Sequence, residues 1–410
     1  MAALTPPGPL PYLTPDLPGI GGRIKEHLDD FRVEELPLYE PCGEGTHLYF
    51  RVTKTGITTP EAVNRLGRFL KVRPHDIGVA GLKDARAVSA QRMSVEHVDP
   101  SVLAGFRDAA MTVKVLGLHG NKLRPGHLRG NRFVIRIRGV SGDHLPAARA
   151  VLDVLVRRGV ANYFGRQRFG ARNDTAALGE CMVRNDLDEF LAIFLGRPQS
   201  DDPPDCRAAR DAFEAGQYAR AQKRWPWVYQ NERKALSAYK KRHRAGAAMV
   251  AIDKRMKRLY VSAFQSLMFN EVLARRIETL DRVFVGDLAE KAENGAVFAV
   301  EDTAAEQPRA DRFEISPTGP VVGYRSRLAG GEPGRIEAEV LAAHAIAPDD
   351  FRHVGSLRPK GTRRALRFVL GEPELTAGAD GRGTFVQLSF TAPSGCYATV
   401  ALREIMKQEG

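Results

Sequence analysis

The chain has 410 residues, and its 61 lysines and arginines outnumber its 49 aspartates and glutamates to give a formal net charge of +12. An apolar content of 43% is ordinary for a chain that buries a full core, and the length allows two or three domains. The positive charge favours a polyanionic partner such as RNA or DNA, because lysines and arginines near phosphates release condensed counterions. A basic surface without such a partner is the alternative.

The four cysteines, Cys42, Cys181, Cys206 and Cys396, lie far apart and form no Cys-x-x-Cys pair. This spacing indicates neither a zinc site nor a disulfide framework, and it fits a reducing cytoplasm. Residues 1–22 contain six prolines and lack a basic start followed by an apolar core. They match neither a signal peptide nor a membrane helix, so we expect a flexible Pro-rich arm.

The first ordered elements should be a strand and a helix. Residues 47–53 are rich in β-formers with alternating polarity, which predicts a strand. A threonine cap and Pro60 then start a helix with apolar residues at helical spacing. This helix leads to a glycine-led loop at Gly81, and residues 92–95 predict a short strand beyond it. The loop is therefore expected between a helix and a sheet edge.

Residues 131–138 give the clearest strand. Its odd-numbered positions are mostly apolar and its even-numbered positions are mostly basic, so one face should be buried and the other charged. A helix over residues 146–158 should follow, with Gly159 at its C-terminal end.

The composition changes between residues 174 and 362, where helical and Asp/Pro-rich segments predominate. A basic and aromatic tract over residues 224–244 could bind an RNA backbone and stack bases. The alternative is a solvated helix with Trp225 and Trp227 in the core. Residues 257–277 predict a long helix with an apolar stripe typical of a core.

The last part of the chain begins with loops and ends with regular elements. Residues 304–311 and 371–383 are polar or glycine-rich and predict loops. A strand over residues 385–390 follows, and a final helix or strand should end near Arg403. No internal repeat is present.

The loop at Gly81 has the strongest chemical signal in the chain. Asp84 stands between Lys83 and Arg86, and nearby positive charge lowers the pKa of a carboxyl group and keeps it ionised. An ionised carboxylate can act as a nucleophile toward an electrophilic sugar carbon. A solvated surface cluster of charges is the alternative, because such ion pairs are common and weak.

The residues of this loop resemble a motif of a known family. Gly81-Leu82-Lys83-Asp84, continued by Arg86-Ala87-Val88-Ser89 and Gln91, resembles the catalytic motif of the TruD family of pseudouridine synthases. Further stretches resemble the same family in the same order, at residues 30–35, 126–133, 162–170, 262–270, 315–320 and 394–404. Ala85 and Ser89 depart from the pattern, since many members have a basic residue and a threonine there.

The resemblance implies an α+β fold. It implies a mixed-sheet pseudouridine synthase catalytic domain at residues 23–164 and 363–410, interrupted by a TruD-type inserted α/β domain at residues 165–362. The implied activity is tRNA pseudouridine synthase, an isomerase acting most typically on uridine 13 of tRNA. Such an enzyme breaks the bond from uracil N1 to ribose C1′ and rejoins the base through C5, with one aspartate and no metal or cofactor.

By the same resemblance, Asp84 is the catalytic aspartate and attacks C1′ or stabilises positive charge there. Lys83 or Arg86 should hold Asp84 ionised and aimed. Lys25 and Phe31 match positions near the family's active site, although a solvated cation and a core ring are the alternatives for them.

Phe133 is the candidate for stacking on the uracil, because Gly130-Asn131-Arg132-Phe133 matches the Gly-Asn-x-Phe motif of the family. The target base must leave its stack to be reached, and it then needs a plane to rest on. Asn131 could orient Asp84 or the base through its amide. A plain core position is the alternative for Phe133, which shares its strand face with Ile135 and Ile137.

The expected partner is tRNA, bound by a cytoplasmic monomer without a membrane or small-molecule cofactor. A catalytically inactive RNA-binding protein and a pseudouridine synthase acting on other RNAs are the alternatives. A methyltransferase is disfavoured because no glycine-rich strand-to-helix turn with an acidic ribose ligand is present. The His-x-Glu and Pro-Cys-x-x-Cys signature of a zinc deaminase is also missing.

Overall fold

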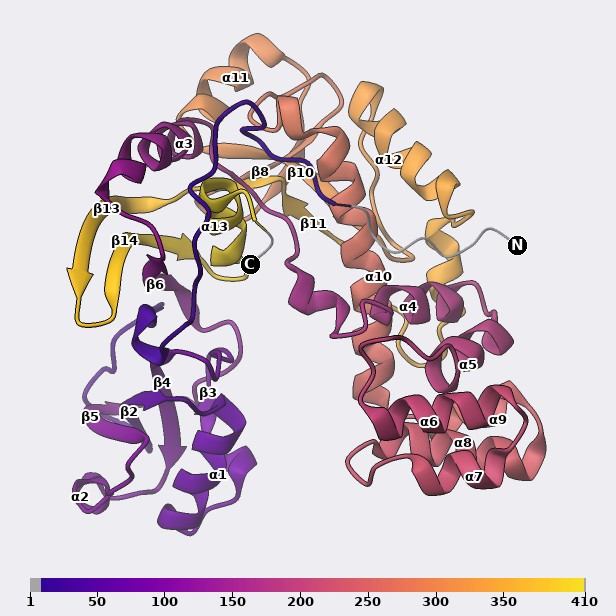
Figure 1. Ribbon diagram of the computed structural model, residues 1–410. Helices are drawn as coiled ribbons and strands as arrows, with labels where there is room; N and C mark the ends of the chain where they lie inside the picture. The colour runs from indigo at the N-terminus through magenta and orange to yellow at the C-terminus, as the bar shows by residue number, and fades with distance from the viewer. Residues whose placement is uncertain (1–8, 409–410) are drawn as a thin grey trace. The chain divides into compact units, whose positions relative to one another are not determined.

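The computed structural model describes residues 9–408, and its chain forms two compact units (Figure 1). The split unit comprises residues 13–160 and 368–408, and the inserted unit comprises residues 161–367 together with residues 9–12. Both units mix helices and strands, which confirms the α+β class. The chain leaves the split unit at β7 (Val160–Ala161) and returns at β12 (Arg367–Phe368), close to the limits expected for an inserted region.

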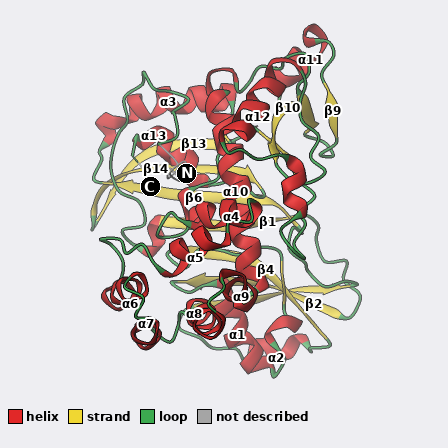
Figure 2. Cartoon of the chain, turned by 90° about the vertical axis from the view of Figure 1, so that its right-hand side faces the viewer, coloured by secondary structure: helices red, strands yellow, loops and turns green. Residues whose placement is uncertain are grey.

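A mixed eight-stranded sheet forms the frame of the split unit, and Figure 2 shows its strands side by side. Its order is β13-β14-β6-β1-β4-β2-β5, with β3 paired to β4, and the pair β1–β4 is parallel. The strands are β1 (Phe31–Pro37), β2 (His47–Thr55), β3 (Gly78–Val79), β4 (Val88–Glu96), β5 (Met111–His119), β6 (Leu128–Arg138), β13 (Gly371–Asp380) and β14 (Gly383–Pro393).

Among the described residues, the split unit has four α-helices and three 3-10 turns. They are α1 (Thr59–Leu70), α2 (Pro100–Ala104), α3 (Leu145–Arg158), α13 (Ala398–Met406) and the 3-10 turns η1 (Leu28–Asp30), η2 (Pro74–Asp76) and η3 (Gly142–His144). Thr58 caps α1 by accepting a hydrogen bond from the backbone N–H of Glu61 at 3.2 Å. Gly159 ends α3 with a positive φ of 85°, which a glycine adopts without strain.

Strand register places the side chains that matter here on one face of the sheet. Phe133 is paired with Val33 and with Phe390, while Val33 is paired with Ser89 and Ser89 with Lys54. Because directly paired residues point to the same side, these five side chains share one face. The same face carries the apolar residues of β2 and β4 that pack beneath α1.

Three expectations about local structure are wrong. Strand β4 lies inside the sheet, between β1 and β2, and is no edge. Residues 371–383 form strand β13 and its turn. The sequence predicts a loop there because β13 is an edge strand whose exposed polar side chains hide the strand pattern. Residues 304–311 belong to helix α11 (Thr303–Asp311), which Asp302 caps through Ala304 N at 2.8 Å.

The expectation of a flexible arm over residues 1–22 is also wrong for its second half, while residues 1–8 lie outside the described part of the chain. The backbone N–H of Leu13 donates to the buried carboxylate of Glu404 at 2.8 Å. Further on, Ile20 N donates to Ile405 O at 3.0 Å and Gly21 N to Met406 O at 3.1 Å. These bonds use carbonyls at the end of α13 that have no partner within the helix, so this segment is fixed to it.

The inserted unit is mainly helical and has a small sheet of order β11-β10-β8-β9. Its helices are α4 (Thr175–Val183), α5 (Leu187–Leu195), α6 (Pro204–Glu214), α7 (Tyr218–Arg224), α8 (Gln230–Arg242), α9 (Ala245–Ala251), α10 (Lys254–Arg275), α11 and α12 (Gly331–Ala343). Its strands are β8 (Leu288–Lys291), β9 (Val297–Ala299), β10 (Ile315–Val321) and β11 (Thr362–Ala365).

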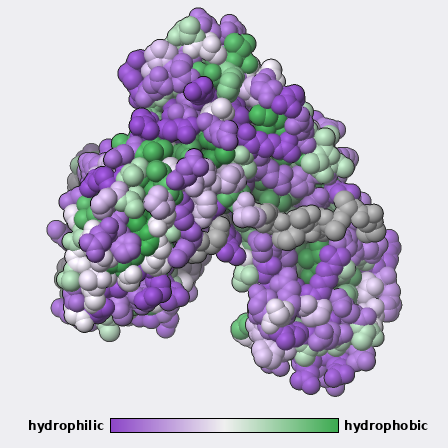
Figure 3. Space-filling model, turned by 45° about the horizontal axis from the view of Figure 1, so that its top comes forward, coloured by the Kyte–Doolittle hydropathy of each residue, from purple (hydrophilic) through white to green (hydrophobic). Residues whose placement is uncertain are grey.

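Helix α10 is the centre of this unit and confirms the long helix expected at residues 257–277. Its apolar stripe is buried as predicted, and two polar residues within the stripe have specific partners. Asn270 accepts from Phe164 N at 2.8 Å and donates to Phe164 O at 3.0 Å, and Gln265 donates to Val322 O. Among the described residues, no helix combines the length and apolar character needed to span a bilayer. Hydrophilic residues predominate on the face shown in Figure 3.

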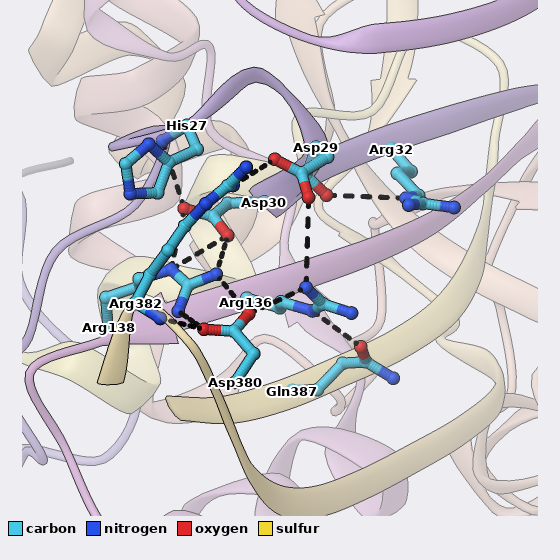
Figure 4. A network of polar contacts seen from close by, with 9 residues as sticks. All are labelled: His27, Asp29, Asp30, Arg32, Arg136, Arg138, Asp380, Arg382 and Gln387. Carbon is cyan, nitrogen blue, oxygen red and sulfur yellow. Dashed lines mark hydrogen bonds and ion pairs between the residues drawn. The ribbon is translucent and has the colours of Figure 1, made fainter. Parts of the chain in front are cut away.

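A buried ion-pair network explains the aspartate of the segment 30–35. Arg138 on β6 donates two hydrogen bonds to Asp30 from Nε at 2.9 Å and a third from Nη2 at 2.6 Å, and it contacts Asp380 at 2.8 Å (Figure 4). Hydrogen bonding from Arg138 holds the pKa of Asp380 far below its usual range. Arg138 and Asp30 have 3% and 0% of their side chains exposed. The network therefore joins η1, β6 and the end of β13.

Candidate active site

The loop between β3 and β4 presents Asp84 to solvent, with 45% of its side chain exposed. Two neighbouring elements fix the backbone before this residue. Thr59 at the start of α1 accepts from Lys83 N at 2.9 Å and donates to Gln91 Oε1 at 2.8 Å. Gln91 on β4 in turn donates to Gly81 O at 3.3 Å. The loop conformation is therefore set by side chains of regular elements.

Lys54 fixes the same loop from below. It is fully buried on β2, and its Nζ donates to Asp84 O at 2.8 Å, Ile57 O at 2.6 Å and Lys83 O at 3.4 Å. Burial lowers the pKa of Lys54 to about 8, although the negative charge of Asp84 acts in the opposite direction. Lys54 is not among the site residues predicted from the sequence. The alternation of side chains along β2 indicates its position, because it places Lys54 on the same face as Phe50 and Val52.

The carboxylate of Asp84 is paired with Lys25. Lys25 Nζ lies 2.6 Å from Asp84 Oδ2, and the lysine side chain is 22% exposed. The same ammonium group lies 4.4 Å from the centre of the Phe31 ring, an attractive cation–π contact. Lys25 also has a left-handed backbone with φ of 57°, so its placement involves an uncommon conformation.

The cation expected to contact Asp84 was therefore misassigned. Lys83 points inward, and its Nζ lies 3.0 Å from Glu35 Oε2 with 6% and 1% of the two side chains exposed. Arg86 donates to Lys25 O at 3.4 Å. Among residues 9–408, neither Lys83 nor Arg86 forms an ion pair with Asp84. Glu35 lies on β1 beneath the loop and captures Lys83, which the linear sequence does not reveal.

Three phenylalanines contact one another in series, and the first of them, Phe31, contacts Lys25. Phe133 stacks on Phe390 with ring centres 5.2 Å apart, and Phe31 meets Phe133 edge-on at 6.3 Å. Phe133 is 7% exposed and Phe31 is 3% exposed. One face of the Phe133 ring is covered by Phe390, so a base can stack only on its other face. Phe390 was not singled out from the sequence, and its signal is its place directly opposite Phe133 in the β6–β14 pair.

Asn131 shares the sheet face of Phe133 and lies opposite Glu35 on β1. Its buried Oδ1 has no hydrogen-bond partner among the described residues, which is uncommon for a buried polar atom. The preceding Gly130 is required by a close approach, because a Cβ there would lie 2.3 Å from Ala392 O on β14. The structure places Asn131 near the loop's Glu35–Lys83 pair and shows no contact with Asp84.

The arrangement combines an exposed carboxylate paired with a lysine, an aromatic cluster and an amide oxygen without a hydrogen-bond partner among the described residues. Such a set can bind a planar polar ring and attack a sugar carbon next to it. In the described part of the chain, no group of three His, Cys, Asp or Glu side chains is placed to hold a metal ion.

Comparisons with known proteins agree with this geometry. A family model described as tRNA pseudouridine synthase D (TruD) matches residues 9–405. The chain is 44% identical over 397 residues to a protein named tRNA pseudouridine synthase D from Geobacter metallireducens, covering 97% of each. It is 43% identical over 400 residues to the protein of that name from Geobacter sulfurreducens, again with 97% of each covered.

A solved structure is also similar. The crystal structure of a protein titled putative tRNA pseudouridine synthase D (TruD) from Methanosarcina mazei superposes with a TM-score of 0.85 at 28% identity, covering 97% of this chain and 96% of that one. Sequence and fold thus agree over nearly the whole length. The chain belongs to the tRNA pseudouridine synthase D (TruD) family.

Proposed function

We propose that this protein isomerises uridine to pseudouridine in tRNA and that Asp84 is its catalytic carboxylate. The observation that carries the proposal is the Asp84–Lys25 pair of 2.6 Å, in which the carboxylate stays exposed and the lysine also contacts the Phe31 ring. The relatives named tRNA pseudouridine synthase D support the same activity.

The reaction breaks the bond between uracil N1 and ribose C1′ and forms a bond between uracil C5 and C1′. The base leaves with the bonding electron pair, and Asp84 either adds to C1′ or stabilises the positive charge that develops there. After the base turns, C5 attacks C1′, and where Asp84 has added, the bond from its oxygen to C1′ breaks and its electron pair returns to the carboxylate. The proton on C5 then leaves, and N1 takes up a proton. No atom is gained or lost overall, so the isomerisation needs no oxidant or reductant.

The neighbouring residues have separate roles in this proposal. Lys25 pairs with the carboxylate of Asp84 and directs one of its oxygens. Phe133 offers a ring to the flipped uracil, Phe31 supports both Lys25 and Phe133, and Asn131 offers its free Oδ1 to an N–H of the base. These contacts are what a base removed from its stack requires.

Lys83 and Arg86 have different roles in this proposal. Lys83 is buried against Glu35, so it shapes the site without contacting the reacting sugar. Arg86 is exposed and its guanidinium has a single weak bond to Lys25 O, which leaves it able to bind a phosphate next to the target nucleotide.

The proposal extends to uridine 13 as the modified position, to a cytoplasmic monomer and to catalysis without a cofactor, as the resemblance implies. Action on other RNAs and binding without turnover are its rivals. Mapping pseudouridine in cellular tRNA with and without this protein separates these cases. Loss of pseudouridine at position 13 alone supports the proposal, whereas loss at other RNA positions favours the broader enzyme.

Asp84→Asn tests the catalytic role directly. The variant should fold, bind tRNA with near-normal affinity and form no pseudouridine, because an amide is a poor nucleophile. Asp153→Asn, on the exposed surface of α3, is the matched control and should retain full activity. Turnover by purified Asp84→Asn above a no-enzyme blank would remove Asp84 from this role, and binding by an inactive natural protein would support the RNA-binding alternative.

A further inference from the structure

The two tryptophans of the chain occupy opposite environments although one proline separates them. Trp225 is 1% exposed, whereas Trp227 is 77% exposed and its neighbour Val228 is 72% exposed. A large aromatic ring left this open forgoes the stabilisation that burial would give it. The sequence interpretation that both tryptophans lie in the core is therefore wrong for Trp227.

The exposed ring sits on a firmly held loop between α7 and α8. Arg233 on α8 donates to Trp225 O at 2.7 Å and to Gln222 O at 3.3 Å, and these bonds hold the chain just before Trp227. Tyr229 N donates to Pro226 O at 3.0 Å, closing the turn that contains Trp227. The ring of Trp225 packs against Tyr229 with centres 5.5 Å apart. The exposure of Trp227 is therefore built into a folded turn.

Positive charge surrounds this loop along the chain and is not neutralised. Residues 218–244 contain nine lysines and arginines and one acidic residue, Glu232. The side chains of seven of the cations form no ion pair or hydrogen bond within residues 9–408, namely those of Lys223, Arg224, Lys234, Lys240, Lys241, Arg242 and Arg244. Free cations beside an open aromatic ring are the composition of a single-stranded nucleic-acid site.

We propose that Trp227 is a stacking platform for an unpaired nucleobase of the bound RNA, with the free cations of α7 and α8 holding adjacent phosphates. The inference rests on the proposed function for the identity of that RNA as tRNA. It assigns a second RNA contact, in the inserted unit, that is separate from the chemistry at Asp84. A protein partner is the less favoured occupant, because lysines are depleted where tryptophans anchor protein interfaces.

Tryptophan fluorescence gives a direct test, because the chain has two tryptophans. In Trp225→Phe the remaining emission comes from Trp227, and stacking of a base should quench it as tRNA is added. The wild-type protein should show the same quenching in part, which covers the case in which Trp225→Phe fails to fold. Trp227→Phe should remove the tRNA-dependent quenching while keeping most of the affinity.

Binding and kinetics give a second readout. Trp227→Ala should weaken tRNA binding by roughly 5- to 150-fold, the range expected for loss of one stacked base. Its kcat at saturating tRNA should stay near normal while KM rises, because the substitution leaves the unit that contains Asp84 unchanged. Val285→Ala, which removes another exposed apolar side chain of the same unit, should leave both constants unchanged.

The outcomes separate this inference from the proposed function. Pseudouridine formation together with unchanged affinity of Trp227→Ala and no quenching by tRNA would overturn the inference and leave the enzyme assignment intact. Quenching by tRNA with no pseudouridine formed would support the stacking site and contradict the enzyme. Absence of quenching by tRNA combined with loss of a protein complex in Trp227→Ala would assign the surface to a protein partner and sink the proposal.

Discussion

Strand β6 and helix α8 are both rich in positive charge, and they use it in opposite ways. On β6, Arg138 lies between Asp30 and Asp380, and Arg136 contacts Asp380 at 3.3 Å. On α8, Lys240 and Lys241 have no acidic partner among the described residues. Charge that is satisfied inside the fold stabilises it, whereas charge left free is available to a phosphate.

Aromatic residues show the same division. Phe133 has ring neighbours on the sheet, while Trp227 has an open face on its loop. Lys54 is also among the residues whose partners lie inside the fold, because its ammonium group donates to backbone carbonyls around Asp84. The amino-acid composition does not distinguish these residues from one another. Their partners in the structure determine whether each one stabilises the fold, shapes the site or is available to RNA.

The largest effect is expected from Arg138→Met. Removing this guanidinium leaves Asp30 buried without its partner, which should lower the free energy of unfolding by about 3 to 5 kcal/mol. Urea denaturation measures the change. Arg132→Met is the control, because the Arg132–Glu372 pair is exposed and should contribute at most about 1 kcal/mol. Equal losses in the two variants would contradict the distinction between buried and exposed pairs.

Lys54→Met should reduce kcat on the order of 10²-fold, since two carbonyls of the Asp84 loop lose the donor that ties them to Ile57 O and the carboxylate shifts. Binding of tRNA should change little. Gln91→Ala, which releases the loop at a single carbonyl, should have a smaller effect. A Lys54→Met enzyme with normal kcat would show that the loop holds itself in place.

The same lysine predicts a pH dependence with opposite signs for activity and stability. Burial lowers the pKa of Lys54 from 10.5 to about 8, so the folded protein loses this proton before the unfolded chain does. The unfolded chain thus binds more protons between about pH 8 and 10.5, and the contribution of Lys54 to stability rises with pH in that window. Activity should instead fall above about pH 8, because the neutral amine has one donor fewer. Rates and melts across this range should diverge in wild type and not in Lys54→Met.

Phe133→Leu should have a smaller effect, with a loss of activity of about one to two decades if the ring stacks on the uracil. Loss of its contact with Phe390 should also cost about 1 kcal/mol of stability. Phe390→Leu breaks the same contact from the buried side and is the matched control, while Phe133→Tyr should stay active if the pocket admits a hydroxyl. Similar melting temperatures and full activity in both leucine variants would assign Phe133 to the core.

The smallest effect on the folded protein is expected from replacing Lys240, Lys241 and Arg242 together by alanine. Stability should not change, whereas tRNA affinity should fall and its log–log salt slope should flatten by roughly 2 to 3, since each phosphate contact contributes about 0.7 to 0.9. Arg275→Ala with Arg335→Ala removes exposed arginines that already have glutamate partners and should leave the slope unchanged. An unaltered slope in the triple variant would assign α8 to a solvated face.

Local patterns allowed much of this structure to be predicted. The strand at residues 131–138 and the long helix near residues 257–277 follow from periodicity, because alternating and three-to-four-residue spacings are set by backbone geometry. The Asp84 loop could be recognised because its residues are consecutive. Strand β13 was missed since an edge strand gains its order from β14 and shows little apolar pattern of its own.

By itself, the sequence determined the fold class, the family and the candidate nucleophile, because each motif that indicates them consists of residues close to one another along the chain. Tertiary structure alone decided the partners. Lys25 reaches Asp84 across 59 positions, while Lys83, its direct neighbour, turns away to Glu35. The physical reason is that an ion pair depends on distance in space and on burial, and strand order sets both in a way that no local pattern reports.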